Sequence, residues 1–275
     1  MNNYQRELDA ALEAVRQASQ LLVQLYDRFQ VVPDAPADIT TDADRRSQEI
    51  ILDHLHRVFP QDALCAEETT PHLASVPQTG PRLWVVDPID GTRGFARKNG
   101  EFSIMVGFVD RGQVALGIVQ EPALRRLTYA VRGGGCYRRD GDETTDSVCR
   151  VSTVADLAAA TVTQSRSQKA SAPSRQILAL KPARTLELYS AGIKLARVAR
   201  GEADIYLNNY ANFHDWDICA GHILVDKAGG KATGLGGQEL RYGEPGAPQA
   251  HGLLASNGLL HAAALRALEG CATPG

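Results

Sequence analysis

Two aspartates three residues apart, Asp87 and Asp90, follow a short apolar segment of the chain. Gly91 comes next and allows a tight turn, in which backbone N–H groups and the Thr92 hydroxyl can point the same way. Two carboxylates at a strand end repel one another and are costly to bury unless a cation neutralises them. Because Mg²⁺ prefers oxygen ligands and turn amides suit a phosphate oxygen, the segment indicates a site for both. A surface turn with solvated aspartates is the alternative for so short a motif.

Three other acidic residues strengthen the case for a metal site. Glu67 follows Leu64–Ala66, a predicted short strand that could place it beside Asp87. Asp44 lies in the first turn of a predicted helix, where it could orient a hydroxyl or a water. Asp217 begins another predicted helix, a position where the helix dipole favours a negative charge in any case. The five carboxylates together suit two or three Mg²⁺ ions, with Mn²⁺ as an alternative, acting on a phosphoryl group.

Helices and strands must bring these residues together. Apolar spacing predicts an amphipathic helix over 4–29 and a second one from Thr41 or Asp42 to Val58, ended by Pro60. Short apolar and alternating segments then predict strands over 83–86, 102–109, 113–120, 126–131 and 136–137. This first half, residues 1–170, is expected to pack helices on a largely antiparallel sheet. Residues 171–275 predict an α/β half, with helices over 191–200, 215–228 and 259–268 and a strand over 204–207, forming one compact unit with the first.

Composition excludes several classes of function. The chain has 275 residues, with 29 Lys and Arg against 32 Asp and Glu, a net charge of −3, and 44% hydrophobic residues. This is typical of a well-cored globular protein without a basic surface for a nucleic acid polymer or a membrane. No secretory signal or apolar run of membrane-spanning length is present, and the five scattered cysteines form no C-x-x-C pair, so we expect a cytoplasmic protein.

Motifs of other phosphate chemistries are absent from the sequence. There is no P-loop, no D-x-D-x-[TV] nucleophile motif, and no cysteine with an arginine six positions later. The sequence also lacks H-E-x-x-H and G-x-S-x-G. Metal-assisted hydrolysis by the acidic residues therefore remains the chemistry that the sequence favours.

Three segments resemble the motifs of the inositol monophosphatase superfamily, a group of Mg²⁺-dependent, lithium-sensitive phosphatases. They are Ala66–Glu68, Trp84–Thr92 and Trp216–Gly221, and their order and spacing match across essentially the whole chain. The resemblance implies a layered αβαβα sandwich, an α+β or α/β fold of the inositol monophosphatase and fructose-1,6-bisphosphatase type, with the site between its halves.

The resemblance also implies a role for each motif residue. Glu67, Asp87 and the Ile89 carbonyl would hold a first metal ion, and Asp87, Asp90 and Asp217 a second. The implied catalytic residues are Asp44, Glu67 and Thr92, of which Thr92 and Asp44 would help to activate the attacking water. Gly91 and Thr92 would bind the phosphate. Pro33 and Asp34 stand where some relatives have a lysine, so the occupancy of a weak third metal site stays open.

Three stretches resemble the 3'(2'),5'-bisphosphate nucleotidase branch of this superfamily. They are Gly94–Phe102, Ser165-Arg166-Ser167, where Gln168 replaces a histidine of that branch, and Ser190–Lys194. A second phosphate needs a second cation, which Lys194 could provide from a helix facing the site. Arg166 and Lys194 could equally be ordinary surface residues.

Tyr210 stands seven residues before the motif aspartate, where inositol phosphatases use a glutamate to hold a ring hydroxyl. Tyrosine is better suited to stack on a flat ring than to accept two hydroxyl hydrogen bonds, although Tyr210 could instead be a core residue. The predicted substrate contacts are Gly91, Thr92, Ser165, Arg166, Lys194 and Tyr210.

The sequence therefore favours hydrolysis of the 3'-phosphate of 3'-phosphoadenosine 5'-phosphate to AMP and phosphate. An inositol-1-monophosphatase, a broader sugar-phosphate phosphatase, or a catalytically silent regulatory protein on the same fold remain alternatives. The expected partner is a small phosphomonoester, and the sequence leaves monomer or homodimer open.

Overall fold

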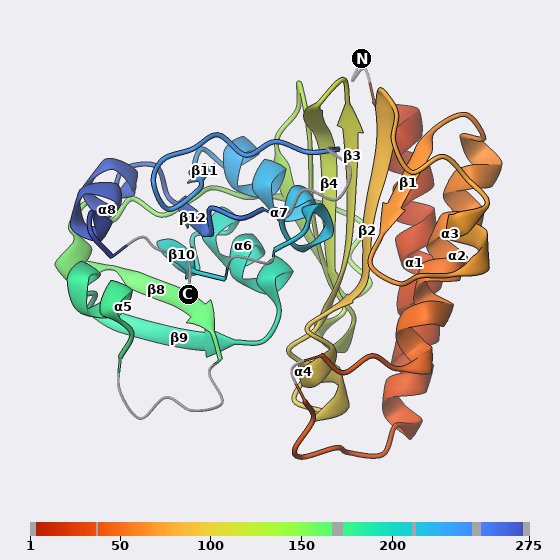
Figure 1. Cartoon of the computed structure of the whole chain (residues 1–275), viewed down its shortest axis with the longest axis horizontal. Helices are drawn as coiled ribbons and strands as arrows, with labels where there is room; N and C mark the ends of the chain where they lie inside the picture. The colour runs from red at the N-terminus through yellow and green to blue at the C-terminus, as the bar shows by residue number, and fades with distance from the viewer. Residues whose placement is uncertain (1–3, 37, 167–172, 211–212, 244–248, 272–275) are drawn as a thin grey trace.

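The structure is a computed structural model that describes residues 4–36, 38–166, 173–210, 213–243 and 249–271 (Figure 1). It has five layers, which Figure 1 shows from right to left. Helices α1 (Gln5–Arg28) and α2 (Asp42–Val58) cover a seven-stranded sheet. Helices α6 (Ala191–Ala199) and α7 (Asp215–Lys227) separate it from a five-stranded sheet, and α5 (Arg175–Leu180) and α8 (His261–Leu268) form the outer layer. The predicted αβαβα sandwich is confirmed.

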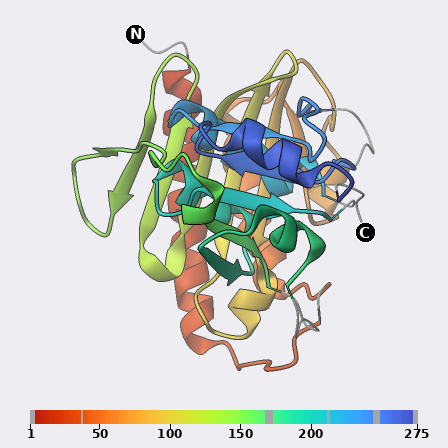
Figure 2. The same cartoon turned by 90° about the vertical axis from the view of Figure 1, so that its left-hand side faces the viewer.

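The first sheet has the strand order β1 to β7, in which only the β1–β2 pair is parallel. Its strands are β1 (Ala63–Ala66), β2 (Arg82–Asp90), β3 (Ser103–Asp110), β4 (Gln113–Glu121), β5 (Arg126–Val131), β6 (Cys136–Asp140) and β7 (Ser147–Val148). Figure 2 shows the edge formed by β6 and β7 projecting from the body of the molecule. The predicted antiparallel character of this sheet is confirmed.

Strand β2 is longer than predicted, because it continues through Pro88 to Asp90. Its pairing with β3 shifts register between Asp87 and Asp90. Pro88 has no N–H to give to a ladder, so an irregularity at this point lets the strand pass the proline without breaking. The predicted end of this strand at residue 86 is therefore wrong, and the irregular segment holds both aspartates at the end of the sheet.

The second sheet has the order β11-β12-β10-β8-β9. Its strands are β8 (Thr161–Ser165), β9 (Arg184–Leu188), β10 (Ile205–Asn208), β11 (Lys231–Thr233) and β12 (Leu253–Ser256). The predicted first half, residues 1–170, includes residues 161–165, but β8 pairs with β9 and β10 of the second sheet. The chain therefore passes from one sheet to the other before residue 161. The short helices α3 (Pro71–Ala74), α4 (Thr92–Ala96), η1 (Pro122–Leu124) and η2 (Leu157–Ala159) complete the described elements.

Buried apolar side chains lie between every two neighbouring layers. One cluster joins α1 and α2 to the first sheet, a second joins both sheets to α6 and α7, and a third joins the second sheet to α5 and α8. Helix α7 packs very close to the first sheet at Gly117, where a Cβ atom would lie 2.2 Å from the Ala220 carbonyl oxygen. The glycine therefore sets how near α7 approaches the strands. No helix in the described ranges is both long enough and apolar enough to cross a bilayer.

Candidate metal-dependent active site

The predicted site residues lie where strands end and helices begin. Asp87 and Asp90 close β2, and Glu67 directly follows β1, the parallel neighbour of β2. Asp44 and Asp217 lie in the first turns of α2 and α7. Gly91 and Thr92 form the turn from β2 into α4.

Asp44 and Thr92 are joined directly. The Thr92 hydroxyl oxygen lies 2.9 Å from Asp44 Oδ1 and 3.0 Å from the Ile89 carbonyl oxygen, so its one proton has two acceptors. The other Asp44 oxygen accepts hydrogen bonds from the Thr41 N–H at 2.8 Å and the Thr41 hydroxyl at 2.6 Å. Burial raises the pKa of Asp44 to about 6, although these hydrogen bonds lower it. The predicted pairing of Asp44 with Thr92 is present in the structure.

Gly91 has a φ of +88°, a left-handed conformation that favours glycine. A Cβ atom there would lie 2.7 Å from the Glu101 carbonyl oxygen and 3.1 Å from the Ser190 nitrogen. Both the backbone conformation and the space therefore require glycine at the turn that carries Thr92.

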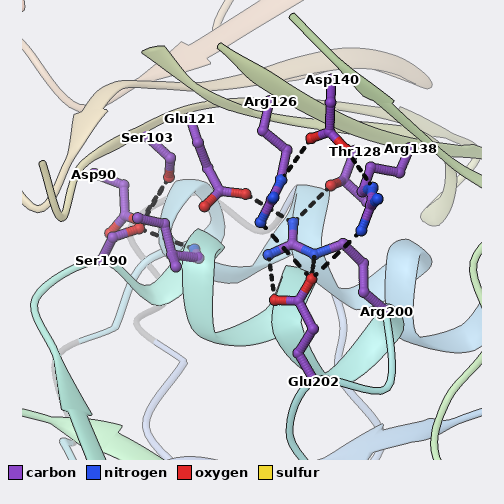
Figure 3. Close-up of polar contacts among 11 residues, drawn as sticks. Asp90, Ser103, Glu121, Arg126, Thr128, Arg138, Asp140, Ser190, Arg200 and Glu202 are labelled. Carbon is purple, nitrogen blue, oxygen red and sulfur yellow. Dashed lines mark hydrogen bonds and ion pairs between the residues drawn. The ribbon is translucent and has the colours of Figure 1, made fainter. Parts of the chain in front are cut away.

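Asp90 is bound to the N-terminus of α6 (Figure 3). Its Oδ1 accepts from the Ala191 N–H at 3.0 Å, and its Oδ2 accepts from the Gly192 N–H at 2.7 Å. The Ser103 hydroxyl at 3.1 Å and the Ser190 hydroxyl also donate to Oδ2. Burial raises the pKa of Asp90, while these hydrogen bonds and the Lys194 charge oppose the rise. Its role as a metal ligand stays a prediction, since both oxygens already have protein donors.

Glu67 and Asp87 are buried carboxylates whose charges are not compensated by nearby cations. Burial and the charges of Asp217 and Asp44 raise the pKa of Glu67 to about 8. Burial raises the pKa of Asp87 well above its usual range, with further repulsion from Glu67 and Asp90. Its Oδ1 is buried without a hydrogen-bond partner among the described residues. Buried carboxylates in this state are stabilised by a cation or by protons.

These residues fit a divalent cation through their chemistry rather than through a preassembled set of ligands. Within the described ranges, no group of three or more His, Cys, Asp or Glu side chains is gathered tightly enough to hold a metal as it stands. Asp217 Oδ2 accepts from the His214 N–H at 2.6 Å, and the Ile89 carbonyl lies beside the Thr92 hydroxyl. A bound cation would give Asp87 Oδ1 a partner and would offset the repulsion that neighbouring carboxylates exert on Glu67.

Lys194 lies close to this site but is fully buried. Its ammonium group donates to the Leu188 carbonyl at 2.9 Å, the Tyr189 carbonyl at 3.2 Å and the Ser165 hydroxyl at 3.3 Å. Burial lowers its pKa to about 8, although the charges of Asp90 and Glu101 raise it. All three of its N–H bonds are therefore used, which counts against the predicted direct contact with a phosphate.

The other predicted substrate contacts lie around Lys194. The Asn208 amide, which sequence analysis missed, donates to the Ser165 hydroxyl at 3.3 Å and accepts from the Tyr210 N–H at 2.6 Å. The Tyr210 side chain is exposed. Arg166 forms an ion pair with Glu101 at 2.7 Å. Ser167 and Gln168, from the same predicted motif, lie outside the described residues.

A cavity of about 430 Å³ is lined by Glu67, Thr69, His214 and Trp216 among others. The rings of His214 and Trp216 stack with centroids 4.4 Å apart. A larger hollow of about 1220 Å³ runs along α1 and contains none of the predicted site residues. Of these two cavities, only the smaller is lined by a predicted site residue, Glu67.

The chain belongs to the inositol monophosphatase family, whose model matches residues 3–273. It is thus a phosphatase of a family that generally uses Mg²⁺. It is 31% identical over 256 residues to a fructose-1,6-bisphosphatase/inositol-1-monophosphatase of Thermotoga maritima, with 92% of each chain covered. It is 29% identical over 238 residues to the 3'(2'),5'-bisphosphate nucleotidase CysQ of Escherichia coli, covering 86% of this chain and 93% of that protein. The solved structure of a Thermotoga maritima IMPase is 30% identical and superposes with a TM-score of 0.79, covering 96% of this chain and 97% of that one.

Proposed function

We propose that this phosphatase removes the 3'-phosphate of 3'-phosphoadenosine 5'-phosphate, releasing AMP and inorganic phosphate. The observation that carries the proposal is the exposed ring of Tyr210, linked through Asn208 to Ser165 at the site. An aromatic ring at this position can stack on a base, whereas it cannot replace a carboxylate that accepts hydrogen bonds from sugar hydroxyls. The 29% identity to CysQ supports the same substrate.

The residues of the site would have separate roles in the reaction. Thr92, held between Asp44 and the Ile89 carbonyl, orients the attacking water, and Asp44 accepts the hydroxyl proton in a hydrogen bond. The Gly91–Thr92 turn offers N–H and hydroxyl donors to the phosphate. Mg²⁺ held by Glu67, Asp87, Asp90, Asp217 and the Ile89 carbonyl would neutralise the carboxylates and stabilise negative charge on the phosphoryl group.

A sugar-phosphate or inositol-phosphate substrate is the second candidate. The Thermotoga maritima relative, named for fructose 1,6-bisphosphate and inositol 1-phosphate, is 31% identical, about as similar as CysQ. Such a substrate would depend on hydroxyl contacts rather than on stacking against Tyr210.

Phosphate release in the presence of Mg²⁺ distinguishes the two candidates. We expect kcat/KM to be highest for 3'-phosphoadenosine 5'-phosphate when it is compared with myo-inositol 1-phosphate and fructose 1,6-bisphosphate. Tyr210→Ala should raise KM for the nucleotide by about 5- to 100-fold, the range expected for loss of one base stack, whereas Tyr210→Phe should not. Faster hydrolysis of either other ester, or equal behaviour of the Ala and Phe variants, would contradict the proposal.

A further inference from the structure

Three arginines surround one tyrosine ring beside the active site. The guanidinium carbons of Arg93, Arg97 and Arg166 lie 5.1, 5.7 and 5.2 Å from the centroid of Tyr189. Arg93 belongs to α4 and Arg97 directly follows it, whereas Arg166 follows β8 in the other half of the molecule. Figure 1 shows α4 on the side of the molecule toward which β9 runs. The cluster therefore joins the two halves.

Carboxylates of the described residues do not balance the positive charges of this cluster. Arg166 pairs with Glu101 at 2.7 Å, and Glu101 also accepts from the Tyr189 N–H at 3.2 Å. Neither Arg93 nor Arg97 forms an ion pair with a carboxylate among the described residues. Their recorded polar contacts are neutral: Arg93 donates to the Ala35 carbonyl at 3.1 Å and Arg97 to the Tyr189 hydroxyl at 2.9 Å. Three guanidinium groups against one carboxylate leave an excess of about two positive charges.

Donors within the cluster are also unsatisfied. The Nε atoms of Arg97 and Arg166 are buried and have no partner among the described residues. A buried donor without an acceptor is costly, and guanidinium groups gathered together repel one another. A phosphate monoester, with about two negative charges and several acceptor oxygens, would relieve both penalties.

The cluster lies next to the phosphate-binding turn without being part of the carboxylate site. Arg93 directly follows Thr92, and Tyr189 directly precedes Ser190, whose hydroxyl donates to Asp90. Ser190 also lies against Gly91, where a Cβ atom would approach its nitrogen to 3.1 Å. An anion held by the arginines would therefore be a neighbour of the phosphate held at Gly91.

We propose that Arg93, Arg97 and Arg166 form an anion site that holds the second phosphate of a bisphosphate substrate. The inference rests on the proposed function only in taking a phosphate ester as the substrate. It assigns to the arginines the role that sequence analysis gave to Lys194, whose three donors are already used. Both a nucleoside 3',5'-bisphosphate and fructose 1,6-bisphosphate carry the group that this site recognises.

Substrate pairs that differ only in the second phosphate test the site. The nucleotide pair is 3'-phosphoadenosine 5'-phosphate and 3'-AMP, and the sugar pair is fructose 1,6-bisphosphate and fructose 1-phosphate. For Arg97→Gln we expect KM of the preferred bisphosphate to rise by about 10- to 100-fold, the loss of one charge-assisted hydrogen bond. The KM of the matching monophosphate should change less than about twofold, and Arg97→Lys should be intermediate because it keeps the charge.

Arg132→Gln is the matched control, because Arg132 also lies over a tyrosine ring, with its guanidinium carbon 5.5 Å from the Tyr4 centroid. Neither Arg132 nor Tyr4 is a predicted site residue. This variant should leave the ratio of bisphosphate to monophosphate kcat/KM unchanged. If Arg97→Gln does not fold, Arg166→Gln replaces it, because Arg166 lies in the same cluster on the other half of the molecule.

The outcomes separate this inference from the proposed function. If only the sugar pair shows the expected loss, the anion site is supported and the nucleotide substrate is wrong. If the wild-type enzyme does not prefer either bisphosphate over its monophosphate, the anion site is overturned. Equal losses on both members of a pair would overturn it as well, because the arginines would then only hold the two halves together.

Discussion

Helix α6 has a cluster of buried charge at each end, and the two clusters are neutralised in different ways (Figure 3). At its C-terminal end, Arg200 is paired with Glu121 and Glu202, both at 2.7 Å, and also donates to Thr128 at 2.8 Å. At its N-terminal end, Asp90 accepts hydrogen bonds from the Ala191 and Gly192 N–H groups. Its charge repels that of Asp87, whose Oδ1 has no partner among the described residues. The charges of one cluster are paired within the chain, whereas the other contains a buried carboxylate oxygen without a partner among the described residues.

The pKa values follow the same division. Burial lowers the pKa of the Arg200 guanidinium, but the charges and hydrogen bonds of Glu121 and Glu202 raise it further, so the net change is upward. Burial likewise raises the pKa of Glu202, and Arg200 more than reverses it. At Glu67, burial and the charges of Asp217 and Asp44 act in the same direction and raise the pKa to about 8, although a hydrogen bond with Asp87 opposes the rise. Paired charges thus stabilise the fold, and unpaired ones mark the site.

Removing the carboxylate of Asp87 should have the largest effect on activity. We expect Asp87→Asn to lower kcat/KM with Mg²⁺ by roughly 10³-fold, on the scale of losing a principal electrostatic group. The melting temperature without metal should stay the same or rise, because a buried unpaired charge is removed. Circular dichroism and a thermal melt should accompany the assay, with the exposed-pair variant Asp142→Asn as control. A loss of less than tenfold would contradict the assigned role of Asp87.

Breaking the ion pairs of Arg200 should lower stability and leave activity unchanged, the opposite of the result expected for Asp87→Asn. Both Arg200 and Glu121 have side chains only 2% exposed, so Glu121→Gln leaves a buried charge short of its partner. We expect a loss of about 3–5 kcal/mol in the free energy of unfolding, seen as a lower melting temperature, with kcat of the folded enzyme unchanged. The surface pair of Glu13 and Arg16 is the control, since Glu13→Gln should cost about 0–1 kcal/mol. Equal costs at the two pairs would refute the distinction by burial.

Stability without metal should fall as the pH rises from about 4.5 to 8. The folded state holds a proton on Glu67 up to a pKa of about 8, whereas the unfolded chain releases it near 4.5. Between these values the folded state binds more protons, so raising the pH favours unfolding by on the order of 1 kcal/mol per pH unit for one proton. Mg²⁺ should therefore stabilise the protein more at pH 8 than at pH 5.5. Thermal melts with and without Mg²⁺ measure this, and a metal effect independent of pH would count against cation binding at Glu67.

The sequence predicted the elements and residues that have strong local patterns. The two N-terminal helices and the β3–β4 hairpin were predicted to within one or two residues, because apolar periodicity and turn residues mark them. Strands β8 and β9 were missed, because Thr161–Ser165 and Arg184–Leu188 are short and partly polar and depend on pairing with each other. Local pattern cannot reveal a strand that its neighbours stabilise.

The site shows the same limit at the level of single residues. The sequence indicated which carboxylates belong to the site. It could not show that Asp90 accepts hydrogen bonds from the N-terminus of α6, because this contact spans about 100 residues of chain. Lys194 was identified as a cation near the site, yet its burial depends on the loop between β9 and α6. Arg93 and Arg97 have no local signal, because only the packing of α4 against Tyr189 brings them to Arg166.

Substitution of Asp140, on the partly exposed side of the Arg200 cluster, should have the smallest effect on the free energy of unfolding. Asp140 accepts from Arg126 at 2.7 Å and pairs with Arg138 at 2.8 Å, but all three side chains are between about a quarter and a third exposed. Burial raises the pKa of Asp140, and the two arginines lower it by more, so its contribution to stability is present above the unfolded pKa and is lost as the pH falls below it. We expect Asp140→Asn to cost about 1 kcal/mol or less at neutral pH, and less still in high salt, because water and ions screen the pair. Urea titration at low and high salt checks this, and a cost near that of Glu121→Gln would mean that the number of ion pairs, rather than their burial, determines the stability of this cluster.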